Sequence, residues 1–150
     1  MFSPVLKEHI KRLESVQKHF IYRVFRKFHI PYLSYFDALS LCKLTSLEYR
    51  RLISDLVFLY KIIVTKEIRS NFNFLSFPPL PNLRRHPFCF RSNIKNTDKL
   101  LSQLLCNRSL SCWNHLPSHI FPPKSSSKLF HTNLLNFNLD NYLYLNVHNF

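Results

Sequence analysis

Two adjacent arginines beside a tyrosine are the residues of this chain whose types and spacing best suit chemistry with a phosphate. Arg50 and Arg51 directly follow Tyr49 within an apolar pattern of helical period. Guanidinium groups contact phosphate oxygens, and a neighbouring aromatic ring can stack on a base. The same arginines can instead lie on a solvated helix face and pair with Glu48 and Asp55, three or four residues away. The sequence leaves both interpretations open.

A second cationic candidate lies in a proline-rich segment. Residues 84–86 read Arg-Arg-His, and the surrounding prolines prevent the helical ion pairs that would otherwise occupy such side chains. For His86 the alternative is a hydrogen-bonded structural role. The predicted contacts to nucleic acid are Arg50, Arg51, Lys61, Arg84, Arg85, His86 and Arg108.

The overall charge favours a polyanionic partner. The chain carries 21 Lys and Arg against 8 Asp and Glu, a net charge of +13. Each phosphate that such a protein neutralises releases counterions, which drives binding. We therefore expect an RNA or DNA phosphate backbone as partner, with an ordinary basic protein as the alternative. The oligomeric state and the choice between RNA and DNA are left open.

Composition excludes several enzyme classes. The chain contains no glycine, so a glycine-rich phosphate loop, a dinucleotide fingerprint and a nucleophile elbow are all ruled out. The aspartates, at positions 37, 55, 98 and 140, are too dispersed to suggest a carboxylate pair that holds two Mg²⁺ ions. We predict no catalytic residues, no cofactor and no metal site.

The four cysteines give no strong metal signature. Cys42, Cys89, Cys106 and Cys112 lack any Cys-x-x-Cys spacing, so buried free thiols are the default interpretation. Cys106, Cys112 and His115 form at most a partial zinc set, because a fourth ligand is missing.

Hydrophobic periodicity predicts a mainly α fold, a small irregular helical bundle. A first amphipathic helix is expected from Pro4 to about Lys27 and a short one from Ser34 to Leu41. A central helix is expected over 45–63, opened by a capping box between Thr45 and Glu48. Further helices are predicted from about 98 to 113 and after 125–127. The apolar stripe predicted for the first helix consists of Leu6, Ile10, Leu13, Val16, Phe20 and Val24.

These elements suggest four segments. Residues 1–70 are an N-terminal helical part, 71–96 a linker rich in Pro and Phe with extended structure, and 97–137 a C-terminal helical part. Residues 138–150 form a tail for which a strand, a frayed helix and disorder all remain open.

No feature indicates membrane insertion or secretion. Charged residues interrupt the apolar pattern of residues 1–20, which a signal peptide does not tolerate. The most apolar run, 56–64, is far shorter than the roughly 20 residues of a membrane-spanning helix. We therefore expect an intracellular protein, nuclear or cytoplasmic.

Three local motifs occur in order along the chain. Residues 13–20 read Leu-Glu-Ser-Val-Gln-Lys-His-Phe, and 47–51 read Leu-Glu-Tyr-Arg-Arg, followed by Asp-Leu and Tyr-Lys-Ile. Residues 113–117 read Trp-Asn-His-Leu-Pro, five positions after an arginine. Trp113 is interpreted as a core anchor rather than a base-stacking platform, Asn114 as a left-handed helix end, and Pro117 as a stop.

In this order and spacing the motifs resemble the region downstream of the polymerase domain in reverse transcriptases of non-LTR, LINE-like retrotransposons of the jockey and chicken-repeat kind. The resemblance covers about residues 2–137. Phe2 stands where the family has Trp, and Arg85 where it tends to have Gly, which suggests a drifted copy. The residues that carry the motifs are Leu13, Glu14, Val16, Gln17, Phe20, Leu47, Glu48, Asp55, Leu56, Tyr60, Trp113, Asn114, Leu116 and Pro117.

The resemblance implies a fragment of an RNA-directed DNA polymerase. Its Tyr-x-Asp-Asp turn, which holds the catalytic metals in the family, is absent from this sequence, so no enzyme activity is expected. The implied former role is to pack beside the polymerase domain, a partner missing here, and to contact template RNA or target DNA. The alternative is a stand-alone basic helical module that binds RNA or another protein.

Overall fold

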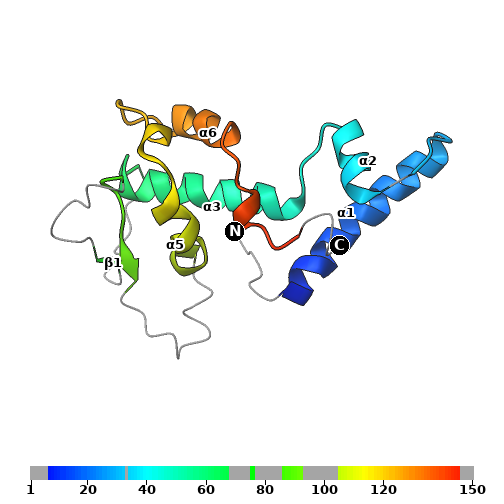
Figure 1. Cartoon of the computed structure of the whole chain (residues 1–150), viewed down its shortest axis with the longest axis horizontal. Coiled ribbons are helices and arrows are strands. Elements are labelled where there is room, and N and C mark those ends of the chain that lie inside the picture. Colours follow the sequence, from blue (N-terminus) through cyan, green and yellow to red (C-terminus); the bar gives the residue numbers. More distant parts are fainter. Residues whose placement is uncertain (1–6, 33, 68–74, 77–85, 93–104, 146–150) are drawn as a thin grey trace. The chain divides into compact units, whose positions relative to one another are not determined.

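The chain is mainly helical, as predicted. A computed structural model describes residues 7–32, 34–67, 75–76, 86–92 and 105–145. Its elements (Figure 1) are the helices α1 (Lys7–Lys27), α2 (Tyr35–Leu41), α3 (Leu47–Ile63), α5 (Leu105–His115) and α6 (Ser127–Leu135), the strands β1 (Leu75–Ser76) and β2 (Arg91–Ser92), and the 3-10 turns η1 (Ser118–Ile120) and η2 (Asp140–Tyr142).

The chain divides into two compact units. Residues 2–51 together with 139–150 form the terminal unit, and residues 52–138 form the central unit. The division falls inside α3 and at 138/139, whereas changes of composition suggested boundaries at 70/71, 96/97 and 137/138. Each unit has its own buried side chains and is described by itself.

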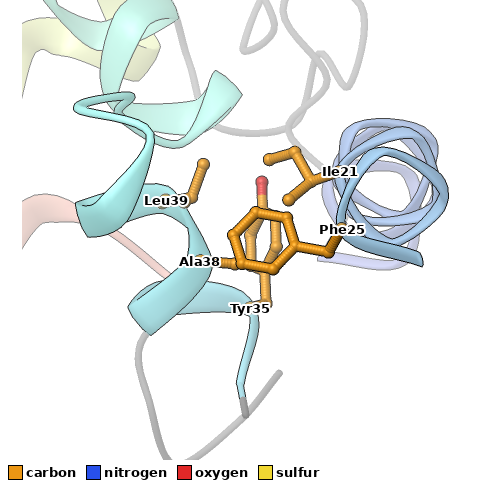
Figure 2. Close-up of a cluster of buried hydrophobic side chains, with 5 residues drawn as sticks. All are labelled: Ile21, Phe25, Tyr35, Ala38 and Leu39. Atoms are coloured by element: carbon orange, nitrogen blue, oxygen red, sulfur yellow. The ribbon is translucent and has the colours of Figure 1, made fainter. Parts of the chain in front are cut away.

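The core of the terminal unit joins α1 to α2. Figure 2 shows Ile21 and Phe25 of α1 packed against Tyr35, Ala38 and Leu39 of α2. All five side chains are at most 4% exposed. The short helix α2 is fixed locally as well, because the Ser34 hydroxyl accepts a hydrogen bond from the Asp37 amide at 3.2 Å, the expected N-cap contact.

The buried face of α1 agrees with the predicted stripe only in part. Ile10 is buried and Val24 is half-buried, as predicted, and Leu6 lies outside the described residues. Leu13, Val16 and Phe20, however, are 39%, 68% and 66% exposed, whereas α1 also buries Glu14, Ile21 and Phe25. The prediction was wrong for these three stripe residues because it counted apolar side chains alone, whereas the helix turns a carboxylate inward to meet polar partners.

The Glu14 carboxylate binds the start of α3. It accepts hydrogen bonds from the Leu47 amide at 2.9 Å, from the Glu48 amide at 3.2 Å and from the Tyr35 hydroxyl at 2.6 Å. The first amides of a helix have no partner within the helix, and its N-terminus favours a negative charge. Burial, together with the bond to Glu14, raises the pKa of Tyr35. Three donors thus compensate a fully buried carboxylate.

The capping box predicted between Thr45 and Glu48 is wrong. Helix α3 begins at Leu47, and the capping hydroxyl is that of Ser46, one residue after Thr45, since the Tyr49 amide donates to it at 3.2 Å. Glu48 instead accepts hydrogen bonds from the amides of Tyr144 and Leu145 at 2.8 and 2.9 Å. Glu14 already satisfies the first amides of α3, so the Glu48 carboxylate is free to fix a distant segment.

The described part of the predicted tail is ordered. Leu139 and Leu145 are buried in the terminal unit, and η2 lies between them. The ammonium groups of Lys7 and Lys11 lie 4.7 and 5.8 Å from the centroid of the Tyr144 ring, within the range of a cation–π interaction. The tail is therefore not disordered over residues 139–145.

Helix ends in this glycine-free chain use other residues with positive φ. His29, Lys43 and Lys66 have φ of 54°, 52° and 53° in the left-handed region that glycine adopts at low cost. After α2, the Lys43 amide donates to Ser40 and the Leu44 amide to Leu39, the bond pattern of a Schellman helix end.

Replacing Lys43 by glycine is expected to stabilise the chain by about 1 kcal/mol, because the left-handed conformation costs a residue with a Cβ about 1–2 kcal/mol and glycine far less. Urea denaturation measures the change in unfolding free energy. Lys43→Ala keeps a Cβ and is expected to give no gain, so an equal gain from alanine would contradict the explanation.

The core of the central unit is aromatic. Tyr60 of α3 stacks on Phe130 of α6 with ring centroids 4.2 Å apart, and Leu56 and Leu59 are fully buried beside them on α3. Helix α6 begins where predicted, at the N-cap Ser126, whose hydroxyl accepts from the Leu129 amide. Strands β1 and β2 pair antiparallel, with Leu75 opposite Ser92, inside the segment predicted to be extended.

Candidate nucleic-acid interface

Trp113 and Asn114 hydrogen-bond to residues 86–90 within the central unit. The Trp113 side chain is fully buried, and its indole N–H donates to the Phe88 carbonyl at 2.9 Å. The carbonyl of Trp113 lies 2.8 Å from Nε2 of His86, while Nδ1 of that ring accepts from the Phe88 amide at 3.2 Å. Nε2 therefore carries the proton and donates to Trp113.

His86 is a structural residue rather than a phosphate contact. Its side chain is 2% exposed and stacks on Phe121 with centroids 4.2 Å apart. Both ring nitrogens are used in hydrogen bonds. The prediction of a nucleic-acid contact at His86 is therefore wrong. The imidazole is buried, and its single N–H already donates to Trp113, so no donor is left for a phosphate.

Asn114 does not close its helix in a left-handed conformation, as the sequence suggested. It lies inside α5, which extends to His115. Its side-chain amide donates to the Phe90 carbonyl at 2.9 Å and accepts from the Phe90 amide at 3.2 Å. The side-chain amide of Asn114 thus forms the same pair of hydrogen bonds with the Phe90 backbone that a neighbouring strand would form. These bonds connect α5 to the residue that precedes β2.

The two arginines of the central motif lie in different environments. Arg50 is exposed, and its guanidinium donates to the side-chain oxygen of Gln17. Gln17 in turn donates to the Thr45 carbonyl at 3.2 Å. Arg51 is half-buried, and one terminal nitrogen of its guanidinium is buried without a hydrogen-bond partner among the described residues. Exposure makes Arg50 the better placed of the two for a phosphate.

The structure describes the other predicted cationic residues only in part. Arg84 and Arg85 lie outside the described residues. Arg108 lies on α5, within a stretch whose side chains are not described. Lys61 is half-buried on α3 and lines a cavity of about 460 Å³ together with Lys128 and His131 of α6.

That cavity contains residues that sequence reasoning missed. Lys128, His131 and Phe58 were not among the predicted contacts, although all three line it with Lys61. Lys61 and Lys128 are separated by 67 positions, and no local spacing signals that they meet. Their helices are brought together by tertiary contacts, among them the stacking of Tyr60 on Phe130 and the hydrogen bond from the Ser126 amide to the Tyr60 hydroxyl.

A second cavity, of about 420 Å³, lies in the terminal unit and has the opposite character. Among the described residues that line it, Asp140 carries the only charge, beside apolar side chains such as Phe36, Leu39 and Leu143. Burial, and then the nearby Asp140, raise the pKa of Tyr49, another lining residue. An anion would be repelled from this cavity.

The thiols that are described do not form a reactive site. Cys112 is 3% exposed, and burial raises its pKa to about 12. In the described part of the chain, no three side chains of His, Cys, Asp or Glu lie close enough together to hold a metal ion. The side chain of Cys106, a member of the partial zinc set, is outside the described residues.

At pH 8 Cys42 is expected to react with iodoacetamide at least about a hundredfold faster than Cys112, because only the thiolate attacks. Cys42 is exposed, whereas Cys112 is buried and its raised pKa keeps the thiol protonated. Peptide mass spectrometry of briefly alkylated native protein measures both sites. Equal rates in the native state would contradict the burial of Cys112, and equal rates are expected only after denaturation.

None of the described helices is both long and apolar enough to cross a bilayer. Comparison with protein-family models, with curated protein sequences and with solved structures finds no match to this chain.

Proposed function

We propose that this chain is a basic helical module that binds RNA through its phosphate backbone. It derives from the region downstream of the polymerase domain in a non-LTR retrotransposon reverse transcriptase, and it has no catalytic activity of its own. Its site of action is intracellular, nuclear or cytoplasmic. Target DNA is the second nucleic acid to which such a module would bind.

One observation carries the proposal: residues of motifs that are separate in the sequence contact one another in space, while Arg50 of the central motif is exposed. Glu14 of the first motif binds the amides of Leu47 and Glu48 in the second. His86, the last residue of the Arg84-Arg85-His86 segment that stands where the family tends to have Arg-Gly-His, donates to the carbonyl of Trp113 in the third motif. Residues that maintain one another's positions would be retained together, which supports descent from one ancestral module.

The charge distribution supports a polyanionic ligand. Arg50 is exposed on α3, and Lys128 is exposed on α6. Of the acidic side chains, Glu14 and Asp55 are buried, and Glu48 is half-buried and bound to two amides. Some of the carboxylates are thus buried or bound within the protein. The electrostatic potential at the surface is therefore more positive than the composition alone suggests.

Fluorescence anisotropy with a labelled single-stranded RNA of about 20 nucleotides tests the proposal directly. We expect saturable binding at low salt that unlabelled RNA competes away. A circular dichroism melt on the same sample establishes that the chain is folded. A cooperatively folded chain that binds no RNA at low salt would overturn the proposal.

Arg50→Gln is expected to reduce the dependence of RNA affinity on salt by about one unit of the log–log slope, because a single phosphate contact is lost. The loss should be similar for RNAs of different sequence. Glu8→Gln is the control. It also changes the charge by one unit at an exposed position, on α1, and it should not lower the slope. An unchanged slope for Arg50→Gln would remove this arginine from the interface.

A protein-interaction module is the second candidate, and the exposed side of α1 favours it. Leu13, Val16 and Phe20 recur at helical spacing and are 39–68% exposed, as expected of a face that a partner once covered. The polymerase domain of the parent protein is the partner implied. Replacing Val16 and Phe20 by glutamine should leave RNA affinity unchanged under the first proposal and should abolish partner binding under the second.

A further inference from the structure

The cavity between α3 and α6 has the size and the walls of a small-molecule site. Its volume of about 460 Å³ falls in the range of roughly 300–1,000 Å³ that is usual for ligand pockets. Helix α3 contributes an apolar wall that includes Ile53, Val57 and Phe58, and α6 contributes Lys128 and His131 opposite Lys61.

The charge of this cavity selects an anion. Two lysines and a histidine line it, and no carboxylate is among its described lining residues. The cavity of the terminal unit, which is similar in volume, carries Asp140 and no lysine or arginine among its own. The contrast shows that a cationic lining is a property of this cavity and not a uniform consequence of a basic composition.

An aromatic ring lies beside the charge. Phe58 is 42% exposed although it lines the cavity, and it precedes Lys61 by three positions, which places both on one side of α3. The exposed part of the ring is available to a ligand, and base–aromatic stacking contributes about 1–3 kcal/mol per base. The lysines can bind the phosphate of a nucleotide, and the ring of Phe58 can stack on its base.

We propose that this cavity binds one nucleotide unit of single-stranded RNA, with its phosphate on Lys61 and Lys128 and its base on Phe58. The hydroxyl of Ser127 and the ring of His131, both in the lining, supply further hydrogen-bond donors to the phosphate. The inference rests on the proposed function insofar as the nucleotide is taken to belong to an RNA strand.

Adenosine 5′-monophosphate is the probe, and isothermal titration of the whole chain is the measurement. We expect saturable binding at one site, at least about tenfold tighter than that of adenosine or of inorganic phosphate, because only the nucleotide uses both halves of the cavity. Lys61→Gln with Lys128→Gln should weaken nucleotide binding by at least about tenfold. Phe58→Leu should reduce the affinity for the nucleotide towards that for phosphate.

Lys124→Gln is the matched control, since Lys124 is an exposed lysine of the same unit that does not line the cavity. A folded chain with no saturable nucleotide binding at millimolar concentration would overturn the inference, as would equal weakening by the control. Binding of phosphate as tight as that of the nucleotide would also overturn it, because the site would then select any anion.

RNA binding by the same variants separates the two proposals. If the double lysine variant loses the nucleotide and part of its RNA affinity, both proposals stand. If the chain binds RNA but not the nucleotide, the cavity proposal fails and the proposed function is retained. If it binds the nucleotide but not RNA, the proposed function fails instead.

Discussion

Replacing Glu14 by alanine is expected to destabilise the chain by about 3–5 kcal/mol. The carboxylate is fully buried and accepts from two amides of α3 and from the Tyr35 hydroxyl. Its removal leaves one buried and two partly buried donors without their acceptor, and a fully buried group of this kind costs about 1–3 kcal/mol. Urea denaturation, followed by circular dichroism, measures the loss of unfolding free energy.

Two variants control this prediction. Glu8→Ala removes a carboxylate from an exposed position of the same helix and is expected to change stability by less than about 0.5 kcal/mol. Tyr35→Phe removes one of the three donors, so the loss in Glu14→Ala should be smaller when Tyr35→Phe is already present. Equal losses from Glu8 and Glu14 would show that Glu14 does not hold the start of α3.

Replacing Trp113 by alanine is the second large prediction, with an expected loss of about 3–5 kcal/mol. The indole is fully buried and lies edge-on to His86 and Phe121. Its N–H also donates to the Phe88 carbonyl, so truncation leaves both a void and an unpaired carbonyl. Since the variant lacks the only tryptophan, its unfolding is followed by circular dichroism.

Leu129→Ala is the control for Trp113, because Leu129 is 53% exposed in the same unit. It should cost less than about 1 kcal/mol. If Trp113→Ala were no more destabilising than Leu129→Ala, the indole would be a surface group, and a base-stacking role for it would have to be reconsidered.

The features that were predictable from the sequence are those fixed within a few residues. Ser34 opens α2 and Ser126 opens α6 because each hydroxyl binds an amide three positions later. Helix α1 ends at Lys27 as expected, and the chain turns at Phe28 and His29, where His29 takes a positive φ. Trp113 was also identified correctly as a core anchor. Local rules suffice for contacts of this kind.

The errors have a common physical origin in contacts between distant residues. Glu14 is buried against partners 21 to 34 positions away, the Tyr35 hydroxyl and the Leu47 and Glu48 amides, which the pattern within α1 does not reveal. Glu48 binds amides 96 and 97 positions away, which no capping rule anticipates. Asn is typical of a helix end, yet the side-chain amide of Asn114 exchanges two hydrogen bonds with the backbone of Phe90, 24 positions earlier.

The candidate interface was predictable only in part, for the same reason. Arg50 is exposed, as a phosphate contact requires, whereas His86 is required by the fold. Lys61 is accompanied in its cavity by Lys128 and His131, and their proximity depends on the packing of α6 on α3. Sequence spacing identifies cations, but only the fold distinguishes those that pair inside the protein from those that face a ligand.

The salt dependence of RNA binding tests the central claim most directly. Affinity for a labelled single-stranded RNA is measured by anisotropy over a series of KCl concentrations, and the logarithm of the association constant is plotted against that of the salt concentration. The account predicts a slope of about −3 to −4, as expected if four to six phosphates are neutralised on a single strand. A flat response in a chain that is folded at every salt concentration would contradict it.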